Sequence, residues 1–327
     1  MNNDKSKILV SICCITYNHA PFIRKALDGF LMQQPPSCVP QGAKMNDWCE
    51  ILIHDDCSTD GTTEIIKEYA AKYPDLIFPL YEKVNQYSQG KENVIDMYNY
   101  GRAKGKYIAY CEGDDYWTDS QKLQKQINFM ETHIDYSVCF HCFKNNIINE
   151  NTYIENTQPS QLIKQYGDID GMDIDMGTYF RGWFTQPLTM LFRVSMYNFD
   201  VRKKYKHFRD MHEIYYLLKA GKCRLMNFDG GVRNVHSGGI ASAISRKQYC
   251  DISLPMDREF YWKTLDKGPK KTYIETLDAC IKEYSKNAKW KAFRCAFARL
   301  VHTGHLRGFI RHMKLILNQQ YTLNVKF

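Results

Sequence analysis

The sequence predicts an α/β fold, in which helices flank a single sheet and a helical C-terminal appendage follows. Three observations lead to this prediction. Short apolar runs that are typical of buried strands alternate with segments whose apolar residues have helical spacing. Polar clusters come directly after three of these strand-like runs. The last part of the chain contains amphipathic helical patterns.

The first strand–helix unit occupies residues 8–32. Residues 8–14 form an apolar run, as in a strand that is buried on both faces of a parallel sheet. A polar turn follows at residues 16–19, and residues 20–32 have helical spacing. The turn lacks a GxGxxG pattern, so the fingerprint of a dinucleotide-binding protein is missing. Residues 35–48 contain Pro and Gly and are predicted to be an exposed insertion.

The second unit consists of a strand at residues 50–54 and a helix at residues 63–72. Between them, residues 55–62 read Asp-Asp-Cys-Ser-Thr-Asp-Gly-Thr. The later polar residues of this stretch could cap the helix, but a cap does not account for Asp55 and Asp56 at the end of the strand. Because ligands of open α/β sheets bind outside the carboxyl ends of the strands, these carboxylates favour a ligand crevice.

The third unit combines a strand at residues 77–81 with a helix at residues 92–103. The next strand, residues 107–111, ends in three carboxylates, Glu112, Asp114 and Asp115. Carboxylates at the end of an apolar strand commonly present oxygen ligands to a hard cation. The alternative is that they cap the next predicted helix, residues 122–133, and this stretch alone leaves both interpretations open. Right-handed crossovers would place all three polar clusters along one edge of the sheet.

The middle of the chain is less regular. Strands are predicted at residues 137–143, 188–193 and 227–235. Residues 144–176 are polar, with four alternating aspartates between residues 168 and 175. The Gly and Glu of an EF-hand loop are missing there, so we predict a solvated loop.

The cysteines and the polar N-terminus narrow the class of protein. The 12 cysteines are irregularly spaced, and we interpret those within apolar runs as reduced and buried. The CxxC at Cys139 and Cys142 has no second pair, so it is interpreted as buried strand residues and not as a zinc site. No window approaches the ~20 apolar residues of a spanning helix, and residues 1–7 show no signal peptide. We therefore expect a cytosolic protein.

The formal net charge of +8 belongs to the C-terminal tail. Residues 282–317 are predicted to form two amphipathic helices that separate near Gly304. Two interpretations are open, since these helices could pack on the rest of the chain or dock on an anionic membrane surface. No acidic residue follows Glu283, whereas nine basic residues do: Lys286, Lys289, Lys291, Arg294, Arg299, Arg307, Arg311, Lys314 and Lys326.

Three motifs, in this order and spacing, resemble a known family. They are residues 10–18 (Val-Ser-Ile-Cys-Cys-Ile-Thr-Tyr-Asn), residues 55–62 and residues 112–117 (Glu-Gly-Asp-Asp-Tyr-Trp). Together they look like the motifs of the family 2 inverting glycosyltransferases of GT-A fold, and the resemblance covers about residues 8–145. It implies a Rossmann-like single mixed sheet flanked by helices.

The resemblance also implies an activity and a domain organisation. Sugar would pass with inversion from a nucleotide-sugar donor, with a UDP-sugar favoured, to a saccharide or lipid-linked acceptor. The implied setting is bacterial cell-surface polysaccharide synthesis, in the cytoplasm or peripherally on the inner face of the plasma membrane, with no nucleic-acid partner. The catalytic domain would span residues 1–245, and the basic helical region residues 246–327.

The donor site follows from the same resemblance. Asp56 would hydrogen-bond the base, and Asp114 would bind Mn²⁺ or Mg²⁺ as part of the family's DxD motif. Here Glu112 takes the place of the usual Asp, which leaves the role of that position open. His236, in a His-x-Gly-Gly sequence, is expected near the diphosphate or the metal. The expected donor-binding residues are Thr16, Asn18, Asp55, Asp56, Asp60, Glu112, Asp115 and His236.

The acceptor side is expected to hold the catalytic base. The resemblance assigns this role to Asp210, which opens a predicted helix, although Arg209 precedes it where the family often has Glu or Gly. Asp210 could also act as a helix cap. Glu213, one turn further on, is the second candidate for the base. The acceptor-side candidates are Trp117, Trp183 and Glu213, and core packing is an equally good interpretation of the aromatic residues.

Two other classes of protein share parts of this pattern. A nucleotidyltransferase that makes sugar nucleotides should carry a Gly-rich phosphate loop with Lys or Arg near the first strand, which residues 16–19 do not provide. A non-catalytic module that binds a sugar or a nucleotide would keep the crevice without needing a base. Donor hydrolysis in the absence of acceptor separates this module from an enzyme.

Overall fold

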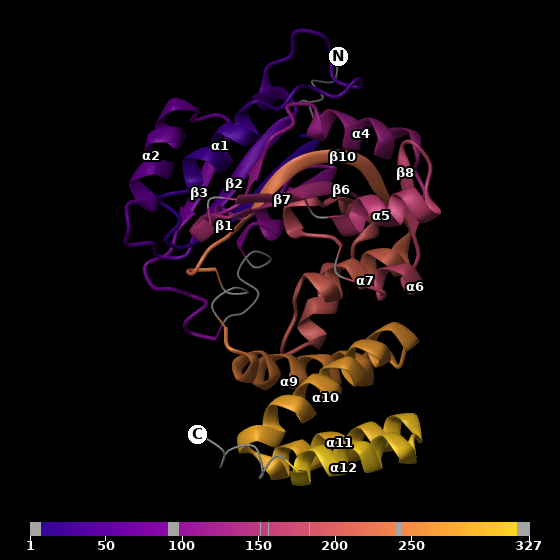
Figure 1. Ribbon diagram of the computed structural model, residues 1–327. Helices are drawn as coiled ribbons and strands as arrows, with labels where there is room; N and C mark the ends of the chain where they lie inside the picture. Colours follow the sequence, from indigo (N-terminus) through magenta and orange to yellow (C-terminus); the bar gives the residue numbers. More distant parts are fainter. Residues whose placement is uncertain are drawn as a thin grey trace. The chain divides into compact units, whose positions relative to one another are not determined.

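The computed structural model describes residues 8–90, 98–150, 152–155, 157–182, 184–239 and 244–318 (Figure 1). The chain divides into two compact units. Unit 1 comprises Met1–Val201 and Phe208–His236, and unit 2 comprises Arg202–His207 and Ser237–Phe327. The expected domain boundary at residue 245 stays a prediction.

Unit 1 is built on a mixed sheet whose first half is parallel. β1 (Val10–Thr16), β2 (Cys49–Asp55), β3 (Ile77–Tyr81) and β4 (Tyr107–Tyr110) lie in the order β3-β2-β1-β4. Their apolar runs are typical of strands that helices cover on both faces. Because parallel strands end at the same edge of a sheet, the polar residues that follow β1, β2 and β4 gather there.

The second half of the sheet contains the antiparallel pairs. β9 (Leu191–Arg193) is antiparallel to both β4 and β6 (Tyr136–Ile147), and it is shorter than predicted because Pro187–Thr189 form a 3-10 turn. β10 (Lys222–Val235) runs parallel to β6 and antiparallel to β5 (Tyr116–Trp117). The expected single mixed sheet is therefore confirmed.

Three helices of unit 1 lie within one to three residues of their predicted bounds. α1 (Ile23–Leu31), α2 (Thr62–Lys72) and α4 (Lys122–Thr132) follow β1, β2 and β5. In α1 the buried apolar side chains recur every three or four residues, so one face of the helix enters the core: Ile23, Ala26, Leu27 and Phe30. Of the predicted helix at residues 92–103, residues 92–97 lie outside the described residues, and Tyr100–Arg102 form a 3-10 helix.

The predicted solvated loop at residues 144–176 is wrong. β6 continues to Ile147, and β7 (Thr152–Glu155), α5 (Thr157–Tyr166) and β8 (Gly171–Ile174) follow. β7 pairs with β6 and β8 with β10. Several of their side chains are exposed, so the stretch lacks the continuous apolar runs from which the other strands were predicted.

Three of the four aspartates of this stretch accept hydrogen bonds from neighbouring groups. Arg224 of β10 donates to Asp168 at 2.8 Å and to Asp173 at 3.3 Å. Asp175 accepts the backbone N–H of Thr178 and thereby caps the short helix α6 (Met176–Tyr179). Their alternation reflects these local roles and not a calcium-binding loop.

Cys139 and Cys142 are confirmed as buried residues of β6. With their neighbours they form part of the interior of unit 1. No cation site needs to be invoked for this pair, because burial alone accounts for two small apolar side chains in a strand.

Unit 2 is helical, as expected. α10 (Lys267–Asn287) packs against α9 (Arg246–Thr264), α11 (Lys289–Thr303) and α12 (Leu306–Asn318). Gly304 ends α11 in the left-handed region, with φ 67°, and confirms the predicted break. Over the described ranges, no helix has the length and apolar character needed to cross a membrane.

Candidate active site

The turn after β1 is locked to the loop after β2. Asn18 adopts φ 54°, in the left-handed region that Asn tolerates better than most residues. Its backbone N–H donates to Ser58 Oγ at 2.9 Å, and its side-chain oxygen accepts the N–H of Thr59 at 2.8 Å. These bonds join two strand ends that the sequence separates by 40 residues.

Asp60 and Asp55 hold the same loops together. Asp60 accepts the backbone N–H of Ala20 at 2.9 Å and the hydroxyl of Thr62 at 2.6 Å. Asp55 accepts the hydroxyl of Thr63 and a backbone N–H of its own loop. Both carboxylates, which the resemblance assigns to the donor site, thus bond mainly to the protein and position the loops at the strand edge.

Asp56 fastens a third loop. Its two carboxylate oxygens accept the backbone N–H groups of Gln86 at 2.6 Å and Tyr87 at 3.0 Å, and only 5% of the residue is exposed. Its own N–H donates to the carbonyl of Thr16 at 3.0 Å. An ionised carboxylate can accept about four hydrogen bonds, so two bonds to the loop leave capacity for a ligand donor.

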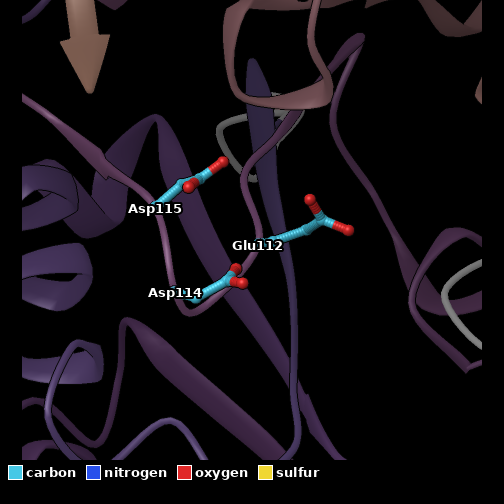
Figure 2. A group of neighbouring side chains, drawn as sticks. All are labelled: Glu112, Asp114 and Asp115. Atoms are coloured by element: carbon cyan, nitrogen blue, oxygen red, sulfur yellow. The ribbon is translucent and has the colours of Figure 1, made fainter. Parts of the chain in front are cut away.

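Three carboxylates gather at the end of β4. Glu112, Asp114 and Asp115 leave the same short loop, as Figure 2 shows, and one oxygen of each lies within 4.8 Å of the other two. Gly113 permits this arrangement, because a Cβ atom there would lie 2.8 Å from the side chain of Thr16. The sequence motif therefore brings its acidic side chains together at the edge where β1 also ends.

Asp114 lies between two histidines. Its Oδ2 atom is 3.1 Å from His236 Nε2 and 3.7 Å from His19 Nε2. Burial tends to raise the pKa of the Asp114 carboxyl, but the hydrogen bond with His236 and the nearby His19 lower that pKa below its ordinary value. Asp114 is thus kept ionised, as a metal ligand must be.

Several buried polar atoms around Asp114 have no hydrogen-bond partner within the described part of the chain. They are Asp114 Oδ1, Thr16 Oγ1 and His19 Nδ1. Buried polar atoms are nearly always paired, so a group of unpaired ones marks a place where a ligand or ion belongs. The oxygen-rich donor set suits a hard divalent cation.

Asn234 supports the acidic loop from β10. Its backbone N–H donates to Asp115 Oδ1 at 2.8 Å, and its side-chain amide donates to the carbonyl of Asp114. The antiparallel pairing of β10 with β5 returns Asn234 and His236 to this loop, about 120 residues after it in sequence. Asn234 was not among the predicted site residues, because no spacing pattern in the sequence connects it to residues 112–115.

His19 was also missed as a site residue, although it lies in the polar turn beside Asn18. It contacts Asp114, and its ring lies 6.3 Å from that of His236 in an edge arrangement. Burial lowers the pKa of His19. The signal that could have found it was its place directly after the Thr-Tyr-Asn of the first motif.

The pKa values of the other two acidic groups of the cluster are raised. Burial, followed by the charges of Asp114 and Asp210, raises the pKa of Glu112 to about 8. Burial, followed by the charges of Asp114 and Glu112, raises the pKa of Asp115 as well. A cation at this position would offset the repulsion among the carboxylates, which adds to the effect of burial on both pKa values.

Asp210 is the first residue of α7 (Asp210–Ala220), and Arg209 occupies the N-cap position. Its Oδ1 accepts the N–H of Met211 at 2.9 Å, and burial raises its pKa. Its charge contributes to the raised pKa of Glu112, so Asp210 lies near the acidic cluster. Glu213, by comparison, is only 3% exposed, and its charge acts on interior groups such as Tyr100.

Of the two aromatic candidates, Trp117 lies in the core. Trp117 is 2% exposed, its indole N–H donates to the carbonyl of Leu188 at 2.9 Å, and Lys122 Nζ lies 3.8 Å from its ring centroid. These contacts make Trp117 a core residue in this structure, as the alternative interpretation of this residue expects. Trp183 lies outside the described residues.

The chain is similar to known glycosyltransferases in sequence. The sequence model of Glycosyl transferase family 2 matches residues 11–204, more than half of the chain. An uncharacterized protein of Mycobacterium tuberculosis is 43% identical over 132 residues, 40% of this chain and 34% of the relative. The Escherichia coli UDP-Glc:alpha-D-GlcNAc-diphosphoundecaprenol beta-1,3-glucosyltransferase WfaP is 33% identical over 124 residues, 38% of this chain and 42% of that enzyme. The matched part spans about a third to two fifths of these relatives.

Two solved structures share the fold at low sequence identity. TarS 1-349 of S. aureus, in complex with UDP-GlcNAc, has a TM-score of 0.61 and 15% identity over 90% of this chain and 81% of that chain. The mannosyltransferase PcManGT of Pyrobaculum calidifontis, in complex with GDP-Man and Mn²⁺, has a TM-score of 0.51 and 17% identity over 96% and 81%. The mixed sheet with its flanking helices is thus the GT-A fold. Because the family model matches most of unit 1, this protein belongs to glycosyl transferase family 2, a family of transferase enzymes.

Proposed function

We propose that the protein transfers a sugar from a nucleotide-sugar donor to an acceptor hydroxyl, with inversion at the anomeric carbon. The observation that carries this proposal is the group of Glu112, Asp114 and Asp115 at the strand edge. Asp114 also has a buried oxygen that has no hydrogen-bond partner among the described residues. Such a group of carboxylates can bind a divalent cation, and a divalent cation can bind the diphosphate of a nucleotide sugar.

The donor we propose is a UDP-sugar. The name of WfaP specifies UDP-Glc, and TarS was solved with UDP-GlcNAc. Asp56 would accept an N–H of the uracil with the acceptor capacity that its loop bonds leave free. Thr16, whose buried hydroxyl has no partner in the described part of the chain, would donate to the nucleotide.

The proposed cofactor is Mn²⁺ or Mg²⁺. Asp114 would hold the cation, with Glu112 and Asp115 beside it, and His236 would help to orient the Asp114 carboxylate. When bound, the cation would offset the negative charge that develops on the departing diphosphate. Asn234 would keep the loop in place through its two hydrogen bonds to it.

Asp210 is the proposed catalytic base. It would take the proton of the acceptor hydroxyl as that oxygen attacks the anomeric carbon, while the bond to the diphosphate oxygen breaks on the opposite face and its electron pair leaves with the nucleotide. The raised pKa of Asp210 suits this role, because a carboxylate with a higher pKa accepts a proton more readily. Glu213 is the weaker candidate, since it is buried in the interior.

We propose a saccharide or lipid-linked acceptor. The name of WfaP specifies a sugar on diphosphoundecaprenol, and a cell-surface polysaccharide pathway on the cytoplasmic side of the membrane would supply acceptors of this class. The turn after β1 has no Gly-rich phosphate loop, which disfavours a nucleotidyltransferase.

The proposal is tested by incubating the full chain with UDP- and GDP-sugars and Mn²⁺, with and without a lipid-linked saccharide. Release of nucleoside diphosphate with an inverted product supports it. A chain that binds the donor but releases no nucleotide under any condition would be a non-catalytic binding module. Release of inorganic pyrophosphate from a nucleoside triphosphate and a sugar phosphate would instead indicate a nucleotidyltransferase.

A further inference from the structure

The hairpin of α11 and α12 exposes large apolar side chains. On α11, Trp290 is 70% exposed, Phe297 53% and Val301 65%. Their spacing of seven and four residues places them on one side of the helix. We use the name hairpin surface for ten exposed residues of the two helices: Trp290, Arg294, Phe297, Val301, Leu306, Arg307, Ile310, Arg311, Lys314 and Leu317.

α12 continues this pattern with two parallel stripes. Leu306, Ile310 and Leu317 form an exposed apolar stripe. One position further along the chain, exposed Arg307 and Arg311 begin a basic stripe that Lys314 continues. An apolar face bordered by Lys and Arg is the composition of helices that lie in the plane of a membrane interface.

The core of unit 2 does not use the hairpin surface. α11 turns Ala292, Cys295 and Ala296 into that core, and α12 contributes Ile316. Arg299 and His312, on the inward sides of the two helices, both pair with Asp278 of α10. The exposed apolar and basic residues are therefore extra to the packing of the unit.

We propose that the hairpin surface docks on a membrane that contains anionic phospholipid. Charge complementarity supports this occupant, because every charged residue after Glu283 is basic. A second copy of the same surface would place like charges opposite one another, which disfavours self-association. Nucleic acid would suit the basic and aromatic residues but leave the aliphatic Val301, Leu306 and Ile310 unmatched. The proposal does not depend on the reaction of unit 1.

The first experiment measures binding of the full chain to lipid vesicles. Vesicles of phosphatidylglycerol and phosphatidylcholine should pull the protein down, and vesicles of phosphatidylcholine alone should not. Binding should weaken as NaCl rises from 0.05 to 0.5 M, because the Debye length shrinks from above about 10 Å to below it. Equal binding to both kinds of vesicle would contradict the proposal.

A matched pair of substitutions locates the contact. Ile310→Glu places a carboxylate on the apolar stripe, and Ile169→Glu places the same carboxylate on unit 1, where Ile169 is 86% exposed. Both variants change the net charge equally, so only a loss of binding confined to Ile310→Glu supports the hairpin surface. Since both side chains are exposed, thermal unfolding should change little in either variant.

A second pair tests the basic stripe and does not depend on the first. Arg307→Gln with Arg311→Gln should weaken binding about 25-fold, at roughly fivefold for each basic residue near an anionic surface. Lys67→Gln with Lys72→Gln, on exposed positions of α2, is the control with the same loss of charge. Equal effects of the two double variants would show that net charge alone attracts the protein, and the hairpin surface would then have no special role.

Two further outcomes would assign the surface to another partner. A dimer in analytical ultracentrifugation that dissociates in Ile310→Glu, without vesicle binding by the parent, would identify a second copy of the chain as the occupant. The other outcome would favour nucleic acid as the partner. In it, a low concentration of a single-stranded oligonucleotide displaces the protein from anionic vesicles, and the protein still binds the oligonucleotide when only phosphatidylcholine vesicles are present.

Discussion

The acidic site of unit 1 and the hairpin surface of unit 2 are built in opposite ways. The site assembles His19, the loop 112–115, Asp210 and His236, which are far apart in sequence and largely buried. The hairpin surface consists of exposed residues from one continuous segment, residues 290–317, and its arrangement follows from helical periodicity. At the site each side chain has one position and few partners, whereas binding at the hairpin surface would combine many small contributions to the binding free energy. Single isosteric changes should therefore act strongly at the site and weakly at the surface.

The largest effect is expected for Asp210→Asn. Asn keeps the shape of the side chain but cannot take up the acceptor proton, so turnover should fall by about 10²–10⁴-fold. Donor affinity, measured by calorimetry, should barely change, because the base acts on the acceptor. Asp173→Asn, at an exposed carboxylate that pairs with Arg224, is the control. Near-normal turnover of Asp210→Asn would move the role of base to Glu213, and lost donor binding would place Asp210 among the metal ligands.

Asp114→Ala should come next. Removing the carboxylate that lies between His19 and His236 should weaken Mn²⁺-dependent binding of UDP by more than about 100-fold, since even partners behind a metal ligand matter by about 10–100-fold. Titrations of UDP with and without Mn²⁺ check this, and the thermal midpoint of the metal-free variant controls for folding. Unchanged Mn²⁺-dependent affinity would remove Asp114 from the metal site.

Asp56→Asn distinguishes recognition of uracil from support of the loop at Gln86 and Tyr87. In the variant an NH2 donor replaces one of the two oxygens that accept from the loop, so the thermal midpoint should fall in either case. If Asp56 also accepts a charge-assisted bond from uracil, UDP should lose about 1.5–3 kcal/mol more binding free energy than inorganic pyrophosphate does. If Asp56 only holds the backbone of Gln86 and Tyr87, the affinities for both ligands should change together. Equal affinities of variant and parent for UDP would show that uracil is bound elsewhere.

Asn234→Ala should have a smaller effect. The variant loses the side-chain bond to the carbonyl of Asp114 but keeps the backbone bond to Asp115, so Mn²⁺ affinity should fall about tenfold. Asn146→Ala is the matched control, because Asn146 donates to Asn234 at 2.8 Å from the other side. If the control weakens Mn²⁺ binding as much, the effect comes from the pairing of β6 with β10 and not from the loop at residues 112–115.

The smallest expected effect is a change in how stability and Mn²⁺ affinity depend on pH. The pKa of Glu112 in the folded chain is about 8, above the ordinary value of about 4.3, so the folded metal-free protein holds an extra proton between these values. Its stability should therefore fall as pH rises from about 5 to 8, and Mn²⁺, which displaces the proton, should bind more tightly over the same interval. Glu112→Gln should flatten both curves. Thermal midpoints in EDTA and Mn²⁺ titrations at pH 6, 7 and 8 check this, and an unchanged slope in the variant would exclude Glu112 as the titrating group.

Much of unit 1 follows from the sequence itself. The apolar runs at β1, β2 and β4 determine a parallel sheet, and their common edge determines that the first motif, Asp55–Asp56 and the carboxylates of residues 112–115 lie near one another. The two helices of the tail, separated at Gly304, are equally local, since a helix depends on contacts three and four residues apart. Elements of this kind can be predicted because a short period in one segment is sufficient to specify them.

Tertiary structure alone decided the contacts that cross the sheet. Asn234 reaches the acidic loop only because β10 pairs with β5, and the same pairing sets His236 beside Asp114. It also decided that Trp117 lies in the core, that Asp56 fastens the loop at Gln86, and that residues 144–176 form strands and a helix with Arg224 as a partner for their aspartates. The physical reason is that strand pairing depends on hydrogen bonds between backbones that are distant in sequence, and the register of such a pair leaves no period in either segment alone.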